Sequence, residues 1–279
     1  MNALLEADSA LSAPASETST SDLRTVRSSA EWIDYFARNA AALRPIPWHT
    51  GAGATEVELA EITASLRAWQ LGETSDGSHL LAAAAHYAAS IGDPDFVGAV
   101  RLFIAEEQRH GADLGRFLEL AGVDRAEADW GDTLFRAIRY AWPRMEIWAT
   151  PVVMVETHAL IYYNALRRAT RSPVLTAICR QILADEVAHI RFQCERLAIL
   201  HRRRSRLLRW LTMRVHCVLF AGITLAVWFG HRRALRAGGY RFPRFWRTAW
   251  GKMHSAWRTM APSGYRWNGE SSGRTEAGL

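Results

Sequence analysis

Two short segments of the chain each place a glutamate three residues before a histidine. The first is Glu106-Glu107-Gln108-Arg109-His110 and the second is Asp185-Glu186-Val187-Ala188-His189. On an α-helix, residues three apart lie on the same face, so each segment directs one carboxylate and one imidazole to the same place. Carboxylates with one imidazole per ion suit iron or manganese. The repeated pattern predicts a site for two metal ions, with ligands Glu107, His110, Glu186 and His189.

Glu156 lies between the two segments and is expected to complete one side of this site. Glu156 and Glu186 are each 15 residues from Arg171. In a helical hairpin that turns at Arg171, residues equally far from the turn lie at the same height. The two carboxylates are therefore expected to face each other across the hairpin.

The other side of the site needs an acid from the preceding helix, and two residues qualify. If the first hairpin turns near Gly92, the position level with Glu107 falls near Gly77. Asp76 is one residue from that position, whereas Glu73 is four residues away but has the longer side chain. Both residues stay open as the first-helix ligand.

Four long helices are needed to position these residues. Apolar periodicity predicts a first helix over 55–90, weakened or kinked at two glycines, and a second that runs to about 120. A third is expected over 151–170, apolar nearly all round as in a buried helix, and a fourth from the Ser172-Pro173 dipeptide to about 197. The irregular stretch 123–148, around a short helix, is long enough to cross from one end of a bundle to the other.

The expected fold is therefore all-α, with a four-helix bundle over residues 29–200. A short helix that Ser29 can cap, ending before Pro45, is expected to lie across the bundle as a strap.

Tyr87, Tyr162 and Tyr163 fall at helical spacing, so they are expected in the core, with a redox role beside the metals as the alternative.

The combination of Glu107-x-x-His110, Glu156 and Glu186-x-x-His189 resembles the ferritin-like di-iron carboxylate superfamily over roughly residues 55–200. The segment 106–110 is similar to the acid-Glu-x-Arg-His motif of bacterial multicomponent hydroxylases. That resemblance implies a supporting layer in which Asp185 orients His110 and Glu106 orients His189, with Arg109 beside them. The stretch 156–164 also loosely resembles the quinone-ring hydroxylases of ubiquinone synthesis.

This resemblance implies a pair of iron ions, with manganese as an alternative, in an enzyme that activates dioxygen. The implied reaction is hydroxylation or desaturation of a hydrophobic small molecule or lipid. An external electron-donor protein is expected, because the sequence contains no flavin, nicotinamide or iron–sulfur motif. Three alternatives stay open: a ferroxidase or peroxide-scavenging protein, a tRNA-base hydroxylase, and a metal-free structural bundle at a membrane.

The composition changes abruptly near His201. Residues 1–200 contain 18 basic and 26 acidic side chains, whereas residues 201–279 contain 16 basic and only two acidic ones. Half of the 12 tryptophans also lie in this last part. The change predicts a basic, aromatic helical extension over 201–279 that contacts an anionic partner.

The extension contains a nearly uninterrupted apolar segment from Val215 to Gly230. Its 16 residues would form about 24 Å of helix, shorter than the roughly 30 Å of a bilayer's hydrocarbon core, so a membrane span is not expected. The flanking tryptophans and arginines favour a helix in the interface of an anionic membrane, and a fifth helix packed on the bundle is the alternative. A nucleic-acid partner is supported by charge alone. The residues expected to contact the membrane or another polyanion are Arg202, Arg203, Arg204, Arg209, Trp210, Trp228, Arg232, Arg233, Trp246 and Trp250.

Residues 1–28 and the cysteines indicate the compartment. The segment 1–28 lacks the basic start and apolar run of a secretory signal, and its content of Ser, Thr, Ala and acids predicts a disordered leader. Cys179, Cys194 and Cys217 form no CxxC pair and no disulfide framework. A cytoplasmic protein is expected, with peripheral attachment to the inner face of the membrane as an option.

Overall fold

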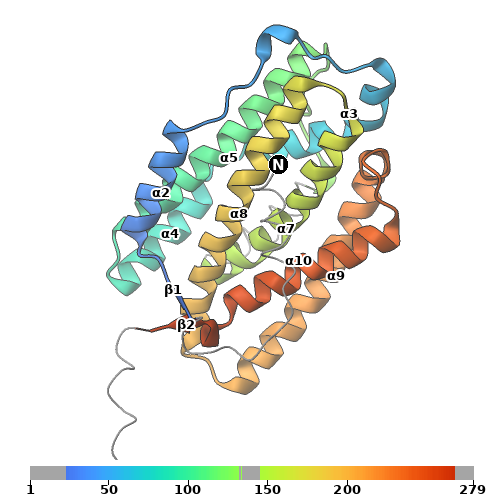
Figure 1. The fold of residues 1–279 in the computed structure, drawn as a ribbon. Helices are drawn as coiled ribbons and strands as arrows, with labels where there is room; N and C mark the ends of the chain where they lie inside the picture. The colour runs from blue at the N-terminus through green and yellow to red at the C-terminus, as the bar shows by residue number, and fades with distance from the viewer. Residues whose placement is uncertain (1–22, 132, 134–144, 268–279) are drawn as a thin grey trace, which may run out of the picture.

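The computed structural model describes residues 23–131, 133 and 145–267, most of which lie in α-helices (Figure 1). The helices of the central bundle are α3 (Glu56–Glu73) and α4 (Ser78–Ile91), α5 (Asp95–Leu120), α7 (Met145–Ala169) and α8 (Pro173–Arg202). Helix α5 packs on α3, α4 and α8, and α7 packs on α8. The predicted all-α bundle is confirmed.

Helix α2 (Ser29–Ala41) lies along α5 as the predicted strap (Figure 1). Its apolar side buries Trp32 and Phe36. The N-cap is Ser28 and not Ser29, because Ser28 is extended while Ser29 is already helical. The Ser28 hydroxyl oxygen accepts from the Glu31 backbone N–H, and the Glu31 carboxylate accepts from the Ser28 backbone N–H at 2.7 Å. A short 3-10 turn, η2 (Trp48–Thr50), follows.

The predicted first bundle helix is broken into two between Glu73 and Ser78. Gly77 adopts a left-handed conformation with φ +69°, and a β-carbon there would lie 2.6 Å from the Ile104 side chain, so the position requires glycine. Asp76 accepts a hydrogen bond from the Ser78 backbone N–H at 3.0 Å in the turn before α4, and the N-cap of α4 is Gly77. Counting residues from the turn at Gly92 favoured Asp76 as the residue level with Glu107. That count assumed one continuous helix, and the helix is broken here.

The second hairpin follows its prediction more closely. The Ser172 side chain caps α8, and Pro173 occupies its first turn. Helix α7 begins six residues before the predicted start, so that Pro151 lies inside it. Part of the predicted 123–148 connection, including most of its short helix, lies outside the described residues, as do residues 1–22 of the predicted leader.

The basic extension folds back onto the bundle. Helix α9 (Arg206–Ala237) packs on α7 and α3, and α10 (Phe242–Met260) packs on α8 and α7 (Figure 1). After the turn η3 (Pro262–Gly264), β2 (Tyr265–Arg266) pairs in parallel with β1 (Arg24–Thr25). Residues 24–25 were predicted as part of a disordered leader. They are ordered because the C-terminal strand supplies a pairing partner that lies 241 residues away in the sequence.

Two apolar clusters fill the bundle, one toward each end. One contains Phe103 of α5 and Phe192 of α8, and the other contains Leu114 of α5 and Ile182 of α8. Along both helices the two clusters are separated by the Glu-x-x-His segments. The fold therefore places a buried polar layer between two apolar layers, and this layer is the candidate site.

Candidate metal centre

Four helices bring six predicted ligands into two overlapping groups. One group consists of Glu73, Glu107, His110 and Glu186, and the other of Glu107, Glu156, Glu186 and His189. Within each group, one ligand atom from every residue lies within 4.8 Å of the others. Glu107 and Glu186 belong to both groups. The arrangement fits two neighbouring cations that share two carboxylates, each with one further carboxylate and one histidine of its own.

Of the two acids proposed from the first helix, Glu73 joins the candidate metal cluster and Asp76 does not. Glu73 ends α3 with its side chain buried in the cluster, whereas Asp76 is exposed in the turn between α3 and α4. Asp76 is in neither group of candidate ligands. The physical reason is the break after Glu73, which leads the chain away from the polar layer at that point.

Each histidine is held by an acid that comes from the opposite hairpin. His110 Nε2 donates to Asp185 Oδ2 at 3.0 Å, and His189 Nε2 donates to Glu106 Oε2 at 2.9 Å. These are the two hydrogen bonds that the resemblance implies. They leave Nδ1 of both histidines facing the carboxylate cluster, where each Nδ1 could bind a metal ion.

Three further polar side chains contact the two orienting acids. Arg109 Nη2 donates to Asp185 Oδ2 at 2.8 Å. Asn39 of the strap helix donates through Nδ2 to both Glu106 Oε1, at 2.6 Å, and Asp185 Oδ1, at 2.8 Å. Gln181 donates to Asp185 from one turn earlier on α8. Arg109 belongs to the predicted set of site residues, whereas Asn39 and Gln181 do not. Gln181 was detectable, because it lies four residues before Asp185 and therefore on the same helix face.

Several buried ligand atoms have no hydrogen-bond partner among the described residues. They are Glu107 Oε1, Glu156 Oε1 and Oε2, Glu186 Oε2, and Nδ1 of both His110 and His189. His189 Nδ1 lies 2.7 Å from Glu107 Oε1, but without the alignment of a hydrogen bond. An unpaired buried carboxylate oxygen or imidazole nitrogen is costly. The unpaired atoms point to the same centre, so the residues present fit a pair of cations.

The electrostatics of the cluster lead to the same conclusion. Burial raises the pKa of Glu73 and of Glu156, and the neighbouring carboxylates of Glu107 and Glu186 add to these shifts. Burial and Glu107 likewise raise the pKa of Glu186. For His189, burial alone would lower the pKa, but the Glu107 and Glu106 carboxylates outweigh it and raise the pKa well above the usual range. Without metal, protons must neutralise the cluster, so metal binding is expected to release protons.

The three tyrosines considered for a redox role are placed differently. Tyr163 donates its hydroxyl hydrogen to Glu73 Oε1 at 2.7 Å and therefore contacts a candidate ligand directly. Tyr162 is stacked on Trp69 with 4.7 Å between ring centroids, and Tyr87 packs in the core against Phe96. Only Tyr163 among the three touches a candidate ligand.

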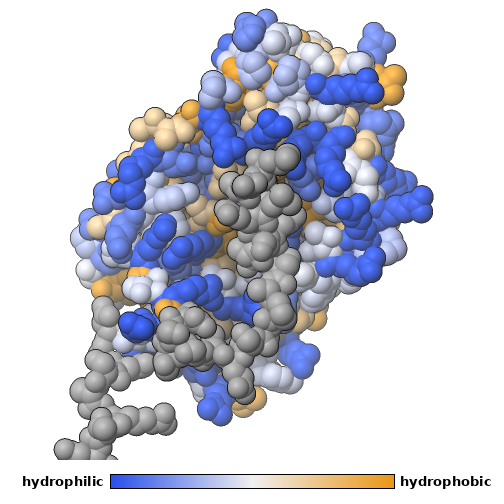
Figure 2. Space-filling model, in the orientation of Figure 1, coloured by the Kyte–Doolittle hydropathy of each residue, from blue (hydrophilic) through white to orange (hydrophobic). Residues whose placement is uncertain are grey.

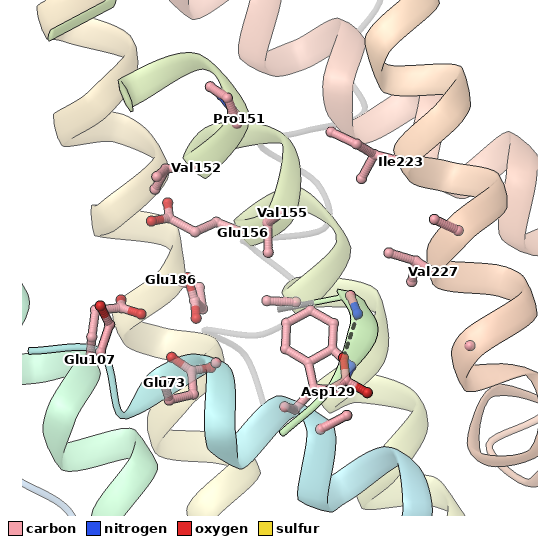
Figure 3. Close-up of a pocket in the computed structure, with 18 of the residues that line it drawn as sticks. Glu73, Glu107, Asp129, Pro151, Val152, Val155, Glu156, Glu186, Ile223 and Val227 are labelled. Atoms are coloured by element: carbon pink, nitrogen blue, oxygen red, sulfur yellow. Dashed lines mark hydrogen bonds between the residues drawn. The ribbon is translucent and has the colours of Figure 1, made fainter. Parts of the chain in front are cut away.

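A cavity of about 410 Å³ lies beside the cluster (Figure 3). The carboxylates of Glu73, Glu107, Glu156 and Glu186 gather at one end of it (Figure 3). Ile223 and Val227 of α9 form part of the opposite wall, and most of the remaining lining is apolar. This volume is within the range of small-molecule sites. No pattern in the sequence predicts that the basic extension forms a wall of this cavity.

The residues predicted to contact a membrane or polyanion fall into two sets. Trp228 is 5% exposed and packs on Phe245, Trp250 is partly buried against Trp257, and Arg204 pairs with Glu146. These three are therefore structural, because the extension folds onto the bundle. In contrast, Arg202, Arg203, Trp210, Arg232 and Arg233 are exposed, and Arg209 and Trp246 are partly exposed.

Fold and site together define the protein as an all-α helical bundle with a buried carboxylate–histidine cluster that could hold metal ions. No known family model, curated protein or solved structure matches the chain.

Proposed function

We propose that the protein is a di-iron enzyme that activates dioxygen and hydroxylates or desaturates an apolar substrate in the cavity beside the cluster. The observation that carries the proposal is that the four glutamates of the cluster are also lining residues of a mostly apolar cavity. A site that only bound metal for stability would not need a cavity against its ligands. Iron bound there would supply open coordination positions for dioxygen and the capacity for redox chemistry.

The protein residues have distinct roles in this proposal. Glu107 and Glu186, which belong to both groups, would help to hold both ions. Glu73 and His110 would hold one ion, and Glu156 and His189 the other. Asp185 and Glu106 hold the histidine Nε2 protons, so that Nδ1 stays available to metal. The Tyr163 hydroxyl donates a hydrogen bond to Glu73 Oε1, so that Glu73 Oε2 would be the oxygen available to a metal ion.

The lining of the cavity indicates the substrate class. The apolar lining includes Phe103, Ile104, Val152 and Val155, together with Ile223 of α9. A ferroxidase would be expected to offer several acidic groups along the path of the incoming iron ion. Among the described lining residues outside the cluster, Asp129 is the one acid, and its carboxylate accepts from the Gly131 backbone N–H. We therefore infer an uncharged or weakly polar substrate with its reactive carbon at the carboxylate end of the cavity. Electrons would come from a separate donor protein.

The metal content tests the first half of the proposal. Protein produced with ample iron is expected to retain about two iron ions per chain by elemental analysis, a count that follows from the two overlapping ligand groups. Glu186→Gln, which alters a carboxylate shared by both groups, should retain far less metal. Glu119→Gln, on an exposed acid of α5, is the matched control and should retain as much as the wild type. Wild-type protein with no bound iron or manganese would refute the proposal.

Turnover tests the second half. The iron-loaded protein is reduced, mixed with isotopically labelled dioxygen and a mixture of apolar compounds, and the products are examined by mass spectrometry. A product that has gained one labelled oxygen atom indicates hydroxylation, and one that has lost two hydrogen atoms indicates desaturation. Rapid oxidation of added ferrous iron without any organic product would assign the protein to the ferroxidases instead.

A further inference from the structure

Helix α9 has an apolar stripe on the side that faces away from the bundle. We define the outer stripe as Leu207, Leu211, Val215, Val218, Leu225 and Phe229, which recur at intervals of three, four or seven residues and are all exposed. Val218 is 76% exposed and Phe229 is 60% exposed. The stripe extends for about 33 Å at 1.5 Å per residue. An apolar surface of this length on a soluble protein marks an interaction site.

The opposite side of α9 is fixed to the protein. His216, Phe220, Thr224 and Trp228 are buried there, and the Thr224 hydroxyl lies 3.0 Å from His158 Nε2 of α7. By length and composition, α9 is the one helix in the described part of the chain that could cross a membrane. Only 22% of its apolar window is buried inside the protein. Because one side packs on α7 and α3, the helix can meet a bilayer along its other side but cannot be surrounded by lipid.

Arginines lie at both ends of the outer stripe, and acids are missing from it. Helix α9 contains six arginines and no aspartate or glutamate. Arg206 stands before the stripe, and Arg232 and Arg236 stand after it, all exposed. On the face drawn in Figure 2, hydrophilic residues predominate outside the grey atoms, and hydrophobic residues are scattered among them. The stripe therefore combines exposed apolar side chains with positive charge at each end.

We propose that the outer stripe of α9 docks on an anionic lipid bilayer, with α9 lying in the plane of the interface. The apolar side chains would enter the region between headgroups and acyl chains, and the arginines would contact the anionic headgroups. Charge decides against a second copy of the chain as occupant. Two α9 helices pressed together in either direction would bring arginine-rich ends into contact with no acid on either helix.

The docked surface adjoins the proposed substrate cavity. Trp130 lines the cavity, is 58% exposed, and sits against Gly230, where an added β-carbon would lie 3.6 Å from the indole ring. Gly230 directly follows Phe229 of the outer stripe. A docked protein would therefore bring the edge of the cavity close to the lipid. That the substrate is drawn from the bilayer rests on the proposed function, whereas docking itself does not.

Vesicle flotation with the full-length, metal-loaded protein tests the docking. Wild-type protein is expected to float with vesicles that mix phosphatidylcholine and phosphatidylglycerol, and to float less with phosphatidylcholine alone. Salt at about 1 M, where the Debye length is about 3 Å, should weaken the binding to the anionic vesicles. The triple variant Val215→Ser, Val218→Ser, Phe229→Ser should lower the partition coefficient by at least about tenfold, since three exposed apolar side chains are removed.

Val57→Ser is the matched control, because Val57 is 77% exposed on α3 and lies outside the stripe. It should bind vesicles as the wild type does, and all variants should keep the wild-type melting temperature. The proposal is overturned if wild-type protein does not bind anionic vesicles, if the triple variant binds equally well, or if the control loses binding too. It is also overturned if the wild type is a dimer that the triple variant dissociates, or if it binds tRNA and no vesicles. Glu186→Gln should bind vesicles normally, which separates a failure of docking from a failure of the metal centre.

Discussion

Each histidine is paired with a different acid from the opposite hairpin. We therefore expect substitution of one acid to weaken the binding of one metal ion more than that of the other. Glu106 is 3% exposed, and its two oxygens accept from different donors: Oε2 from His189 at 2.9 Å and Oε1 from Asn39 at 2.6 Å. Glu106→Gln keeps the shape of the side chain but offers only one oxygen. One donor loses its acceptor, at about 1–3 kcal/mol, and the histidine loses a charged partner.

The expected result is a loss of about 10–100-fold in affinity for one of the two ions, equivalent to about 1.4–2.7 kcal/mol. His189 belongs to the ligand group that contains Glu156, so Glu106→Gln should weaken that ion first. Asp185→Asn, by the same reasoning, should weaken the ion held by His110. Titration with manganese in competition with a chelator measures both binding steps, and paramagnetic resonance of the half-loaded protein shows whether the remaining ion differs between the two variants.

Glu119→Gln controls for the loss of one negative charge on α5, because Glu119 is exposed and pairs only with Arg125 among the described ion pairs. It should bind both ions as the wild type does. The reasoning would be refuted if Glu106→Gln and Asp185→Asn left both affinities unchanged, or if they weakened the same ion to the same extent. If a metal-free variant melts at a lower temperature, its loss in free energy of unfolding is measured and taken into account before the metal affinities are compared.

Three further predictions concern charge, histidine burial and the cavity. In metal-free protein, burial and the Glu186 carboxylate raise the pKa of Glu156. The stability that protonated Glu156 contributes is therefore lost as the pH rises through this raised pKa. Glu156→Gln should therefore raise the melting temperature of metal-free protein more at about pH 8 than at about pH 5, and a constant difference by calorimetry would contradict this. Burial lowers the pKa of His158 to about 4 from its ordinary 6.5, so stability should be lost as pH falls through this interval, by up to about 1.4 kcal/mol per pH unit. Urea unfolding of His158→Gln should show a shallower loss over the same interval, and an unchanged slope would argue against buried, neutral His158. Val155→Trp should fill the cavity and abolish product formation while the iron content stays at the wild-type level. Loss of iron would contradict this and would mean that Val155 helps to hold the metal-binding residues in position.

Sequence reasoning was most successful where a helix is uninterrupted. Glu107 and His110, like Glu186 and His189, are three apart on one helix, so their convergence needed no knowledge of the tertiary fold. Glu156 and Glu186 could be matched in height because a tight turn at Arg171 joins two regular helices. The same count failed for Asp76, because the chain leaves the helix after Glu73.

The sequence by itself therefore determined the helical class, five of the six candidate ligands in the cluster and the basic character of the last 79 residues. The tertiary structure decided that Glu73 is the sixth candidate ligand, that Asn39 joins the two orienting acids, and that α9 has one side in the cavity wall and another exposed. The physical reason is the range of the interactions. Helical spacing fixes neighbours within a few residues, whereas Asn39 meets Asp185 across 146 residues only after α2, α5 and α8 have packed together.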